Sequence, residues 1–307
     1  MTICEGDGMR ILVAGGAGAI GRELTPMLVA AGHEVWATSR SAVKAADIEG
    51  EGAHPLVMDV YLPQTVEEAF VASRPDAVIH QLTDLADYDV AANARIRIEG
   101  TQALVDAARR HGVQRMVAQS ISWVVPDGDS LGTEQEPFRD GVTPGVPELE
   151  AAVLELPHGV VLRYGQLYGP GTWHSARSAE SDAALRRALT ATTEIGSFVH
   201  VADAAAAAVL ALHWPRGVVQ IVDDEPARAE EWLPVLADAL GAPAPAVPTG
   251  LPHGRPASNA LARSLGWRPR FASWRQGFTA PDGGVAVPAG TAASPDTTTG
   301  AAESRVS

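Results

Sequence analysis

Lysine is almost absent from this chain of 307 residues. Lys44 is the only one, and Lys and Arg together number 23 against 37 Asp and Glu, which gives a formal net charge of −14 at pH 7. The arginines are scattered, without a basic run. Nucleic-acid binding depends on clustered cationic side chains that neutralise phosphates. The charge balance therefore excludes a non-specific nucleic-acid-binding protein, and we expect a small molecule as the partner.

Cysteine and long apolar stretches are scarce as well. Cys4 is the single cysteine, so an internal disulfide is impossible, and neither Cys nor His spacing indicates a metal site. No apolar run approaches the ~20 residues of a membrane-spanning helix. Residues 1–8 lack the basic and then apolar pattern of a signal peptide. We expect a cytoplasmic protein that binds neither metal nor membrane, and the oligomeric state stays open.

Short apolar runs alternate with longer amphipathic stretches along most of the chain. This alternation predicts β-α-β units and a doubly wound parallel sheet, in which ligands bind beyond the carboxyl ends of the strands. The predicted strands are residues 10–14, 34–38, 54–58, 76–80, 114–118, 159–163 and 217–222. The predicted helices are residues 19–31, 63–73, 89–111, 147–155, 182–192, 203–213 and 229–240.

The first predicted strand leads directly into a glycine-rich segment and then a predicted helix. Its glycines have the spacing Gly15-x-x-Gly18-x-x-Gly21. A strand–turn–helix of this kind brings backbone N–H groups and a helix amino terminus close to a pyrophosphate. The motif predicts a dinucleotide site formed by Gly15, Gly18, Ala19, Ile20 and Gly21.

The second predicted strand ends in Ser39, Arg40 and Ser41. An acidic residue at this place hydrogen-bonds the ribose hydroxyls of NAD, whereas Arg40 and the serines offer donors to a 2′-phosphate. We therefore predict NADPH as the cofactor, with a solvated surface arginine as the alternative. Asp59, which Val60 follows, is placed to accept a hydrogen bond from the adenine amino group or, alternatively, to cap a helix.

Over roughly residues 10–278 the chain resembles the extended short-chain dehydrogenase/reductase family, the NAD-dependent epimerase/dehydratase group. Besides the glycine turn, the similar segments are residues 76–82, 99–108, 161–171, 198–203 and 265–269. The resemblance implies a Rossmann-like doubly wound α/β sheet with a small split substrate-binding lobe. It further implies that the cofactor is contacted by Val60, Gln81, Leu82, Tyr164, Gln166 and Leu167.

This resemblance also predicts how the chain is divided. We expect residues 9–168 and 199–225 to form the dinucleotide-binding domain, and residues 169–198 and 226–278 to form the substrate lobe. Residues 281–307 are small and polar, and cannot bury enough apolar area to offset the entropy of ordering. We expect this last segment to be a flexible tail that is dispensable for folding and cofactor binding.

The chain departs from the family at its acid–base pair, a Tyr followed four residues later by a Lys. Lys44 has no tyrosine four residues before it. In the stretch where the pair belongs, Pro144 aligns with the Tyr and Glu148 with the Lys, and neither can exchange a proton as that pair does. The family's serine after the fifth predicted strand corresponds to Ser120 or Ser122. We expect one of them to donate a hydrogen bond to a substrate oxygen.

Loss of general acid catalysis slows a reaction by typically ~10²–10⁴-fold and does not by itself abolish hydride transfer. A phenol beside the ketone of an aromatic polyketide of the angucyclinone type would supply the proton, and Trp123 and Trp173 would line its pocket. We predict an NADPH-dependent ketoreductase of antibiotic biosynthesis. The alternatives are a nucleotide-sugar epimerase or dehydratase, and a non-catalytic NADP-sensing regulatory protein.

Other polar residues near the expected site have a structural interpretation beside a catalytic one. Arg95 and Arg97 precede Gly100 on a predicted helix, where they would face either an acidic substrate or solvent, and we expect solvent. We favour a structural role over a catalytic one for five residues: His80, Tyr164, Tyr168, His174 and His200.

Overall fold

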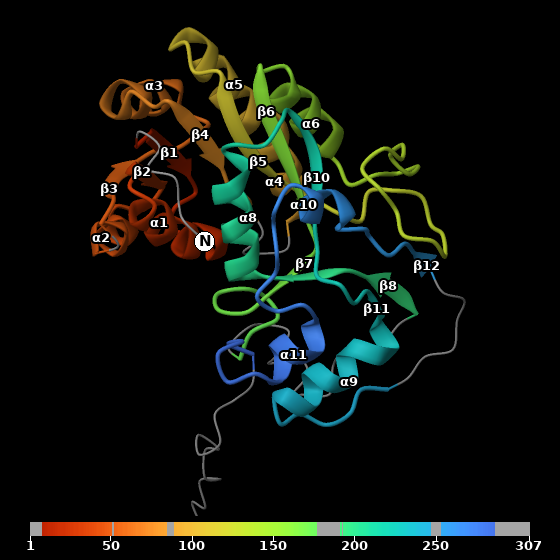
Figure 1. Ribbon diagram of the computed structural model, residues 1–307. Helices are drawn as coiled ribbons and strands as arrows, with labels where there is room; N and C mark the ends of the chain where they lie inside the picture. The colour runs from red at the N-terminus through yellow and green to blue at the C-terminus, as the bar shows by residue number, and fades with distance from the viewer. Residues whose placement is uncertain are drawn as a thin grey trace, which may run out of the picture.

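Figure 1 shows a computed structural model of the chain, which describes residues 8–50, 52–84, 89–176, 191, 193–246 and 253–285. A seven-stranded parallel sheet forms one half of the molecule, in the order β3-β2-β1-β4-β5-β6-β10. The strand order reverses between β1 and β4, which places the topological switch point there. The strands are β1 (Arg10–Ala14), β2 (Glu34–Ser39), β3 (His54–Val57), β4 (Ala77–His80), β5 (Arg115–Ile121), β6 (His158–Tyr164) and β10 (Gly217–Ile221).

Helices cover both faces of the sheet (Figure 1). Because strand side chains alternate, Ile11 and Val13 pack beneath α1 and α8, while Leu12 and Ala14 pack beneath the helices of the other face. No helix within the described ranges is long and apolar enough to cross a membrane. The first face carries α1 (Ala19–Ala30) and α8 (Val201–Ala211), and the second carries α3 (Pro63–Ser73), α5 (Thr101–Arg110) and α6 (Val146–Leu154). The doubly wound α/β fold is confirmed.

A smaller lobe with its own apolar core adjoins the sheet (Figure 1). Aromatic side chains fill this core: Phe278 makes edge-to-face contacts with Tyr168 and Phe198 and a tilted contact with Trp274. The lobe contains β7 (Gln166–Tyr168), β8 (Glu194–Gly196), β9 (Phe198–His200), β11 (Ala227–Arg228), α9 (Ala229–Ala239), β12 (His253–Gly254) and α11 (Trp274–Thr279).

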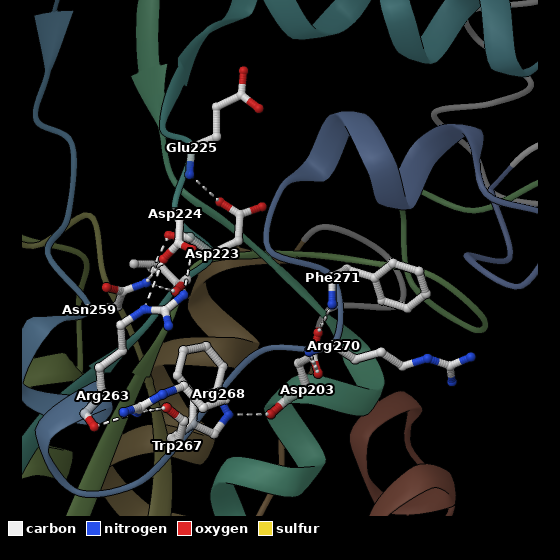
Figure 2. A network of polar contacts seen from close by, with 11 residues as sticks. Asp203, Asp223, Asp224, Glu225, Asn259, Arg263, Trp267, Arg268, Arg270 and Phe271 are labelled. Atoms are coloured by element: carbon white, nitrogen blue, oxygen red, sulfur yellow. Dashed lines mark hydrogen bonds and ion pairs between the residues drawn. The ribbon is translucent and has the colours of Figure 1, made fainter.

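Two carboxylates hold the segment of the chain that runs from the sheet to the lobe (Figure 2). The Asp203 carboxylate on α8 accepts hydrogen bonds from the backbone N–H groups of Arg270 and Phe271, at 2.7 and 3.0 Å. After β10, Asp224 forms an ion pair with Arg263 and accepts a hydrogen bond from the Asn259 amide. These contacts fix residues 259–271, including α10 (Ala260–Ser264), beside the carboxyl end of the sheet.

Several elements differ from the sequence prediction. The helix expected over residues 89–111 is divided into α4 (Val90–Arg95), a π-helical turn η1 (Ile96–Gly100) and α5. Helix α2 (Ala42–Gly50) and the short strands of the lobe were not predicted. Residues 182–190 and 192 of the helix predicted over 182–192 lie outside the described residues.

The expected tail boundary at residue 281 is too early. Val285 is fully buried in the lobe core, and the Gly283 carbonyl accepts a hydrogen bond from His200 Nε2 at 3.2 Å. The body therefore extends through residue 285, because the apolar side chain of Val285 packs into the lobe core. Residues 286–307 lie outside the described residues.

Candidate cofactor and substrate site

The turn after β1 is compact because its glycines leave no space for side chains. Gly15 has a φ of +97°, and a Cβ atom there would lie 2.8 Å from the Gln81 carbonyl oxygen. A Cβ atom on Gly21 would lie 2.3 Å from the Gly15 oxygen, so α1 begins directly against the turn. Gly18 is the N-cap residue and supplies no side-chain cap to α1, whose amino end includes Ala19 and Ile20. This cradle of backbone N–H groups fits a pyrophosphate.

The ends of β2 and β4 approach each other beside this turn. Arg40 is half-exposed, and its guanidinium lies 3.7 Å from the carboxylate of Asp84, beyond β4. The Ser39 hydroxyl accepts a hydrogen bond from the Ser41 N–H at 3.1 Å. An arginine is thus available for a 2′-phosphate, although a carboxylate already shares it.

Asp59 lies after β3, where Val60 follows it into the apolar core. One Asp59 carboxylate oxygen accepts a hydrogen bond from the Tyr61 N–H at 3.0 Å. The N-cap residue of α3 is Leu62, so the alternative interpretation of Asp59 as a helix cap is wrong. Its role toward adenine stays a prediction.

The segment after β4 contains a buried side-chain amide that can accept a further hydrogen bond. Gln81 donates from its backbone to the Ala14 carbonyl at 2.8 Å and from Nε2 to the Tyr164 hydroxyl at 3.4 Å. Its Oε1 atom is buried and has no partner among the described residues. The neighbouring Leu82 carbonyl accepts a hydrogen bond from Gln119 at 2.9 Å. A bound cofactor could donate the missing hydrogen bond to Gln81 Oε1.

Tyr164 is a wall residue in this structure. Its side chain is buried between β6 and α8, where the hydroxyl donates to the Ala204 carbonyl at 3.3 Å. Burial raises the pKa of Tyr164, so the phenol gives up its proton less readily. Gln166 and Leu167 follow on β7, where Gln166 donates from its backbone to the Ser197 carbonyl at 2.7 Å. Their expected contacts with the cofactor stay predictions.

The two candidate serines have different surroundings. Ser120 Oγ donates to Glu150 Oε1 at 2.7 Å, and Arg163 holds the same carboxylate through bonds of 2.9 and 2.8 Å. All three side chains are buried, so Ser120 joins β5, β6 and α6 internally. Ser122 follows β5, and its hydroxyl has no hydrogen-bond partner among the described residues. Of the two serines, Ser122 is the one whose hydroxyl is not already bonded within the described part of the chain, and its role toward a substrate stays a prediction.

The two residues that we align with the family's acid–base pair are not buried. Pro144 and Glu148 are both exposed, on either side of Gly145, the N-cap residue of α6. Glu148 lies in the first turn of the helix, where solvent reaches its carboxylate. Lys44 is exposed on α2. None of these side chains is positioned to lower the pKa of a phenol.

Arg97 is buried, with only 8% of its surface exposed, so the expectation that it faces solvent is wrong. It lies in η1, and the wider π turn rotates the following side chains relative to an α-helix. Its guanidinium donates to the Pro144 carbonyl at 3.3 Å. Arg95 matches the expectation: it is exposed, 2.9 Å from Glu99, and stacked over the ring of Tyr61.

The histidines are held by structural hydrogen bonds. His80 accepts the Leu82 N–H at Nδ1, so Nε2 donates to the Thr101 hydroxyl at 3.0 Å, and burial lowers its pKa to about 4. Burial likewise lowers the pKa of His200 to about 4, while His174 Nδ1 lies 3.1 Å from the Leu167 carbonyl. In the part of the chain that the structure describes, no group of three or more His, Cys, Asp or Glu side chains could hold a metal ion.

Two tryptophans are partly exposed beyond the strand ends. Trp123 follows Ser122 and is 40% exposed, and Trp173 follows β7 and is 38% exposed. Tyr168, in contrast, is fully buried in the lobe, and burial raises its pKa. The tryptophans thus offer aromatic surface, whereas Tyr168 belongs to the core.

A cavity of about 600 Å³ opens at the opposite, amino edge of the sheet. Its lining includes Arg10, Asp76 and Arg115, which stand at or beside the starts of strands, and Arg10 pairs with Asp76 at 3.3 Å. Because ligands of doubly wound sheets bind at the carboxyl edge, this cavity is separate from the dinucleotide site.

Known proteins resemble both the sequence and the fold. Residues 11–147 match the model of the NAD dependent epimerase/dehydratase family. The chain is 38% identical over 300 residues to a 3-diazoavenalumate denitrifying reductase from a Streptomyces species, which covers 86% of this chain and 97% of that protein. The chain belongs to the NAD-dependent epimerase/dehydratase family.

Two other family members extend this comparison. A 4-hydroxy-2-methyl-3-oxo-4-farnesyl-3,4-dihydroquinoline-1-oxide ketoreductase from Stigmatella aurantiaca is 32% identical over 152 residues, 48% of this chain and 45% of that protein. The structure of a Thermus thermophilus UDP-glucose 4-epimerase in complex with NAD has a TM-score of 0.73 at 25% identity, covering 88% of this chain and 97% of the epimerase. The reductase relatives support an oxidoreductase.

Proposed function

We propose that this chain is an NADPH-dependent reductase that delivers a hydride to an aromatic small molecule without a general acid of its own. One contrast carries the proposal. The dinucleotide turn is complete, while Pro144 and Glu148 are exposed in the stretch where the family's Tyr and Lys belong. A reductase relative along almost the whole chain supports it.

NADPH, when bound, supplies a hydride. The amino end of α1 and the glycine turn would hold its pyrophosphate, and Arg40 would bind its 2′-phosphate. Ser122 would donate a hydrogen bond to the substrate, while Trp123 and Trp173 would offer it aromatic surface. The protein's contribution is then orientation and the exclusion of water.

The first candidate substrate is an aryl diazonium compound. The name of the Streptomyces relative describes a reductase that removes nitrogen from a diazo compound. Replacing the diazonium group by hydrogen consumes one hydride, releases dinitrogen and forms the arene. No oxyanion is produced in this exchange, so no proton has to be delivered. The missing Tyr and Lys are unnecessary for such a reaction.

The second candidate is a ketone of an angucyclinone-type aromatic polyketide, reduced in antibiotic biosynthesis. The chain resembles the ketoreductase of the simocyclinone pathway, and the Stigmatella relative is named as a ketoreductase. A neighbouring phenol on the substrate would supply the proton, and Ser122 would polarise the carbonyl. An epimerase or dehydratase is less well supported, because its first step removes a proton with a base that this chain lacks.

The loss of NADPH absorbance tests the proposal with four compounds: an arenediazonium salt, an aromatic ketone with a neighbouring phenol, the methyl ether of that ketone, and a UDP-sugar. Oxidation of NADPH with the first or second compound identifies the reductase and its substrate class. Turnover of the UDP-sugar would favour the epimerase or dehydratase. NADPH binding without any turnover would favour a non-catalytic NADP-sensing protein.

A further inference from the structure

Arg97 is a buried cation that has no counter-ion among the residues that the structure describes. It is 8% exposed, and burial lowers the pKa of its guanidinium. Among the described residues its one hydrogen bond goes to the neutral carbonyl of Pro144, which leaves most of its N–H donors unused. The nearest acid in sequence, Glu99, is taken by Arg95. A buried charge is costly without a paired opposite charge, so this guanidinium calls for an anion.

A second source of positive potential lies beside Arg97. Helix α6 begins at Gly145 without a side-chain cap, so its amino end carries a partial positive charge that only the Glu148 carboxylate of the first turn offsets. A Cβ atom on Gly145 would lie 2.8 Å from the Cβ of Arg97, so the helix start is pressed against the arginine. Glu148, in the first turn, is exposed. The arginine and the helix end together form a compact cationic corner.

This corner adjoins the segment whose acid–base pair is missing. Pro144, which holds the Arg97 guanidinium, aligns with the family's Tyr. Ser122 follows β5, the strand that leads into this segment, and α6 packs against both β5 and η1. An anion at Arg97 would therefore lie beside the stretch where the family's acid–base pair belongs.

We propose that Arg97 and the amino end of α6 bind an anionic oxygen of the substrate, a carboxylate or a phenolate. The inference rests on the proposed reductase function, since it names the group by which that substrate is held. The guanidinium would add a second charge-assisted hydrogen bond beside its bond to Pro144. The site thereby selects acidic aromatic substrates over their neutral esters and ethers.

Binding of 4-hydroxycinnamate and of its methyl ester to the NADP⁺-saturated protein tests this by calorimetry. The wild-type chain should bind the acid at least ~10-fold more tightly than the ester, and Arg97→Gln should weaken acid binding by ~10–100-fold. Arg97→Lys should retain part of the preference. Arg95→Gln, on the same helical segment but exposed, is the matched control and should bind as the wild type does.

Thermal unfolding separates a binding role from a structural one. Because Arg97 has no counter-ion in the described part of the chain, Arg97→Gln should melt at the same temperature as the wild type or higher, and NADP⁺ affinity should not change. Equal wild-type affinity for acid and ester, or no binding of the acid, would overturn the proposal. Arg97→Gln that binds the acid normally but loses NADP⁺ would assign the arginine to a cofactor phosphate and also overturn it.

These binding measurements are independent of turnover. An acid preference that depends on Arg97, in a protein that oxidises NADPH with none of the substrates above, would uphold the anion site and reject the reductase. Turnover of one of those substrates, without any preference for the acid over the ester, would uphold the reductase and reject the anion site. If Arg97→Gln does not fold, the wild-type comparison of acid with ester and the Arg97→Lys variant still decide the question.

Discussion

The turn after β1 and the start of α6 lie at the same edge of the sheet but have diverged differently from the family. The turn acts through backbone N–H groups and the absence of Cβ atoms, so a side chain at Gly15 or Gly21 would damage it. The start of α6 acts through side chains, which can be exchanged while the helix remains. The glycines of the predicted dinucleotide site are therefore retained in this chain, whereas Pro144 and Glu148 stand where we align the family's Tyr and Lys.

Breaking the buried ion pair between Glu150 and Arg163 should have the largest effect on the free energy of unfolding. Glu150→Gln leaves Arg163 buried without its counter-charge, and removal of one partner of such a pair costs about 3–5 kcal/mol. Glu148→Gln, two residues earlier and exposed, should cost under about 1 kcal/mol, the usual range for a charge near a helix end. Urea unfolding of both variants measures the difference. Equal destabilisation would show that Glu150 is not the residue that fixes this helix.

The corresponding test of the turn after β1 compares two of its glycines. A methyl group on Gly21 would lie 2.3 and 2.4 Å from backbone oxygens, and overpacking of this kind costs typically about 1–3 kcal/mol. Gly21→Ala should therefore melt earlier and lose most of its NADPH affinity. Gly18→Ala meets its nearest atom at 3.3 Å, at a φ of −78°, and should be far milder in both respects. Comparable losses in the two variants would contradict the close approach of α1.

The choice between NADPH and NADH tests the ends of β2 and β4, which lie beside that turn. Arg40→Ala should weaken NADPH binding by ~10–100-fold, the value of a lost charge-assisted pair, and leave NADH binding nearly unchanged. Asp84→Asn removes the carboxylate 3.7 Å from Arg40 and should strengthen NADPH binding a few-fold, because it removes a negative charge near the 2′-phosphate. Titration calorimetry with both cofactors measures these changes. Tighter binding of NADH than NADPH by the wild type would refute the role of Arg40.

Sequence patterns predicted the parts of this structure that follow from local rules. The seven strands of the sheet were placed within a few residues, because apolar runs bounded by turns identify buried parallel strands. The register of the serines could not be predicted, since the bond between Ser120 and Glu150 joins residues 30 positions apart. The burial of Arg97 depends on a π turn that has no sequence signature, and the burial of Val285 depends on packing against lobe residues that are distant in sequence.

The smallest expected effect is on turnover, when side chains that could donate the proton to the substrate are removed. If no side chain serves as general acid, Ser122→Ala should slow turnover by only ~2–10-fold, as expected for one neutral hydrogen bond, and Tyr164→Phe should leave kcat nearly unchanged because its hydroxyl is bonded to Ala204. Loss of a true general acid would instead cost ~10²–10⁴-fold. With a ketone substrate, methylation of the neighbouring phenol should slow the reaction far more than either substitution, whereas a diazonium substrate should need no such phenol. A substitution that abolishes turnover while NADPH still binds would identify the missing acid. The site would then have kept a proton donor as well as the glycine turn.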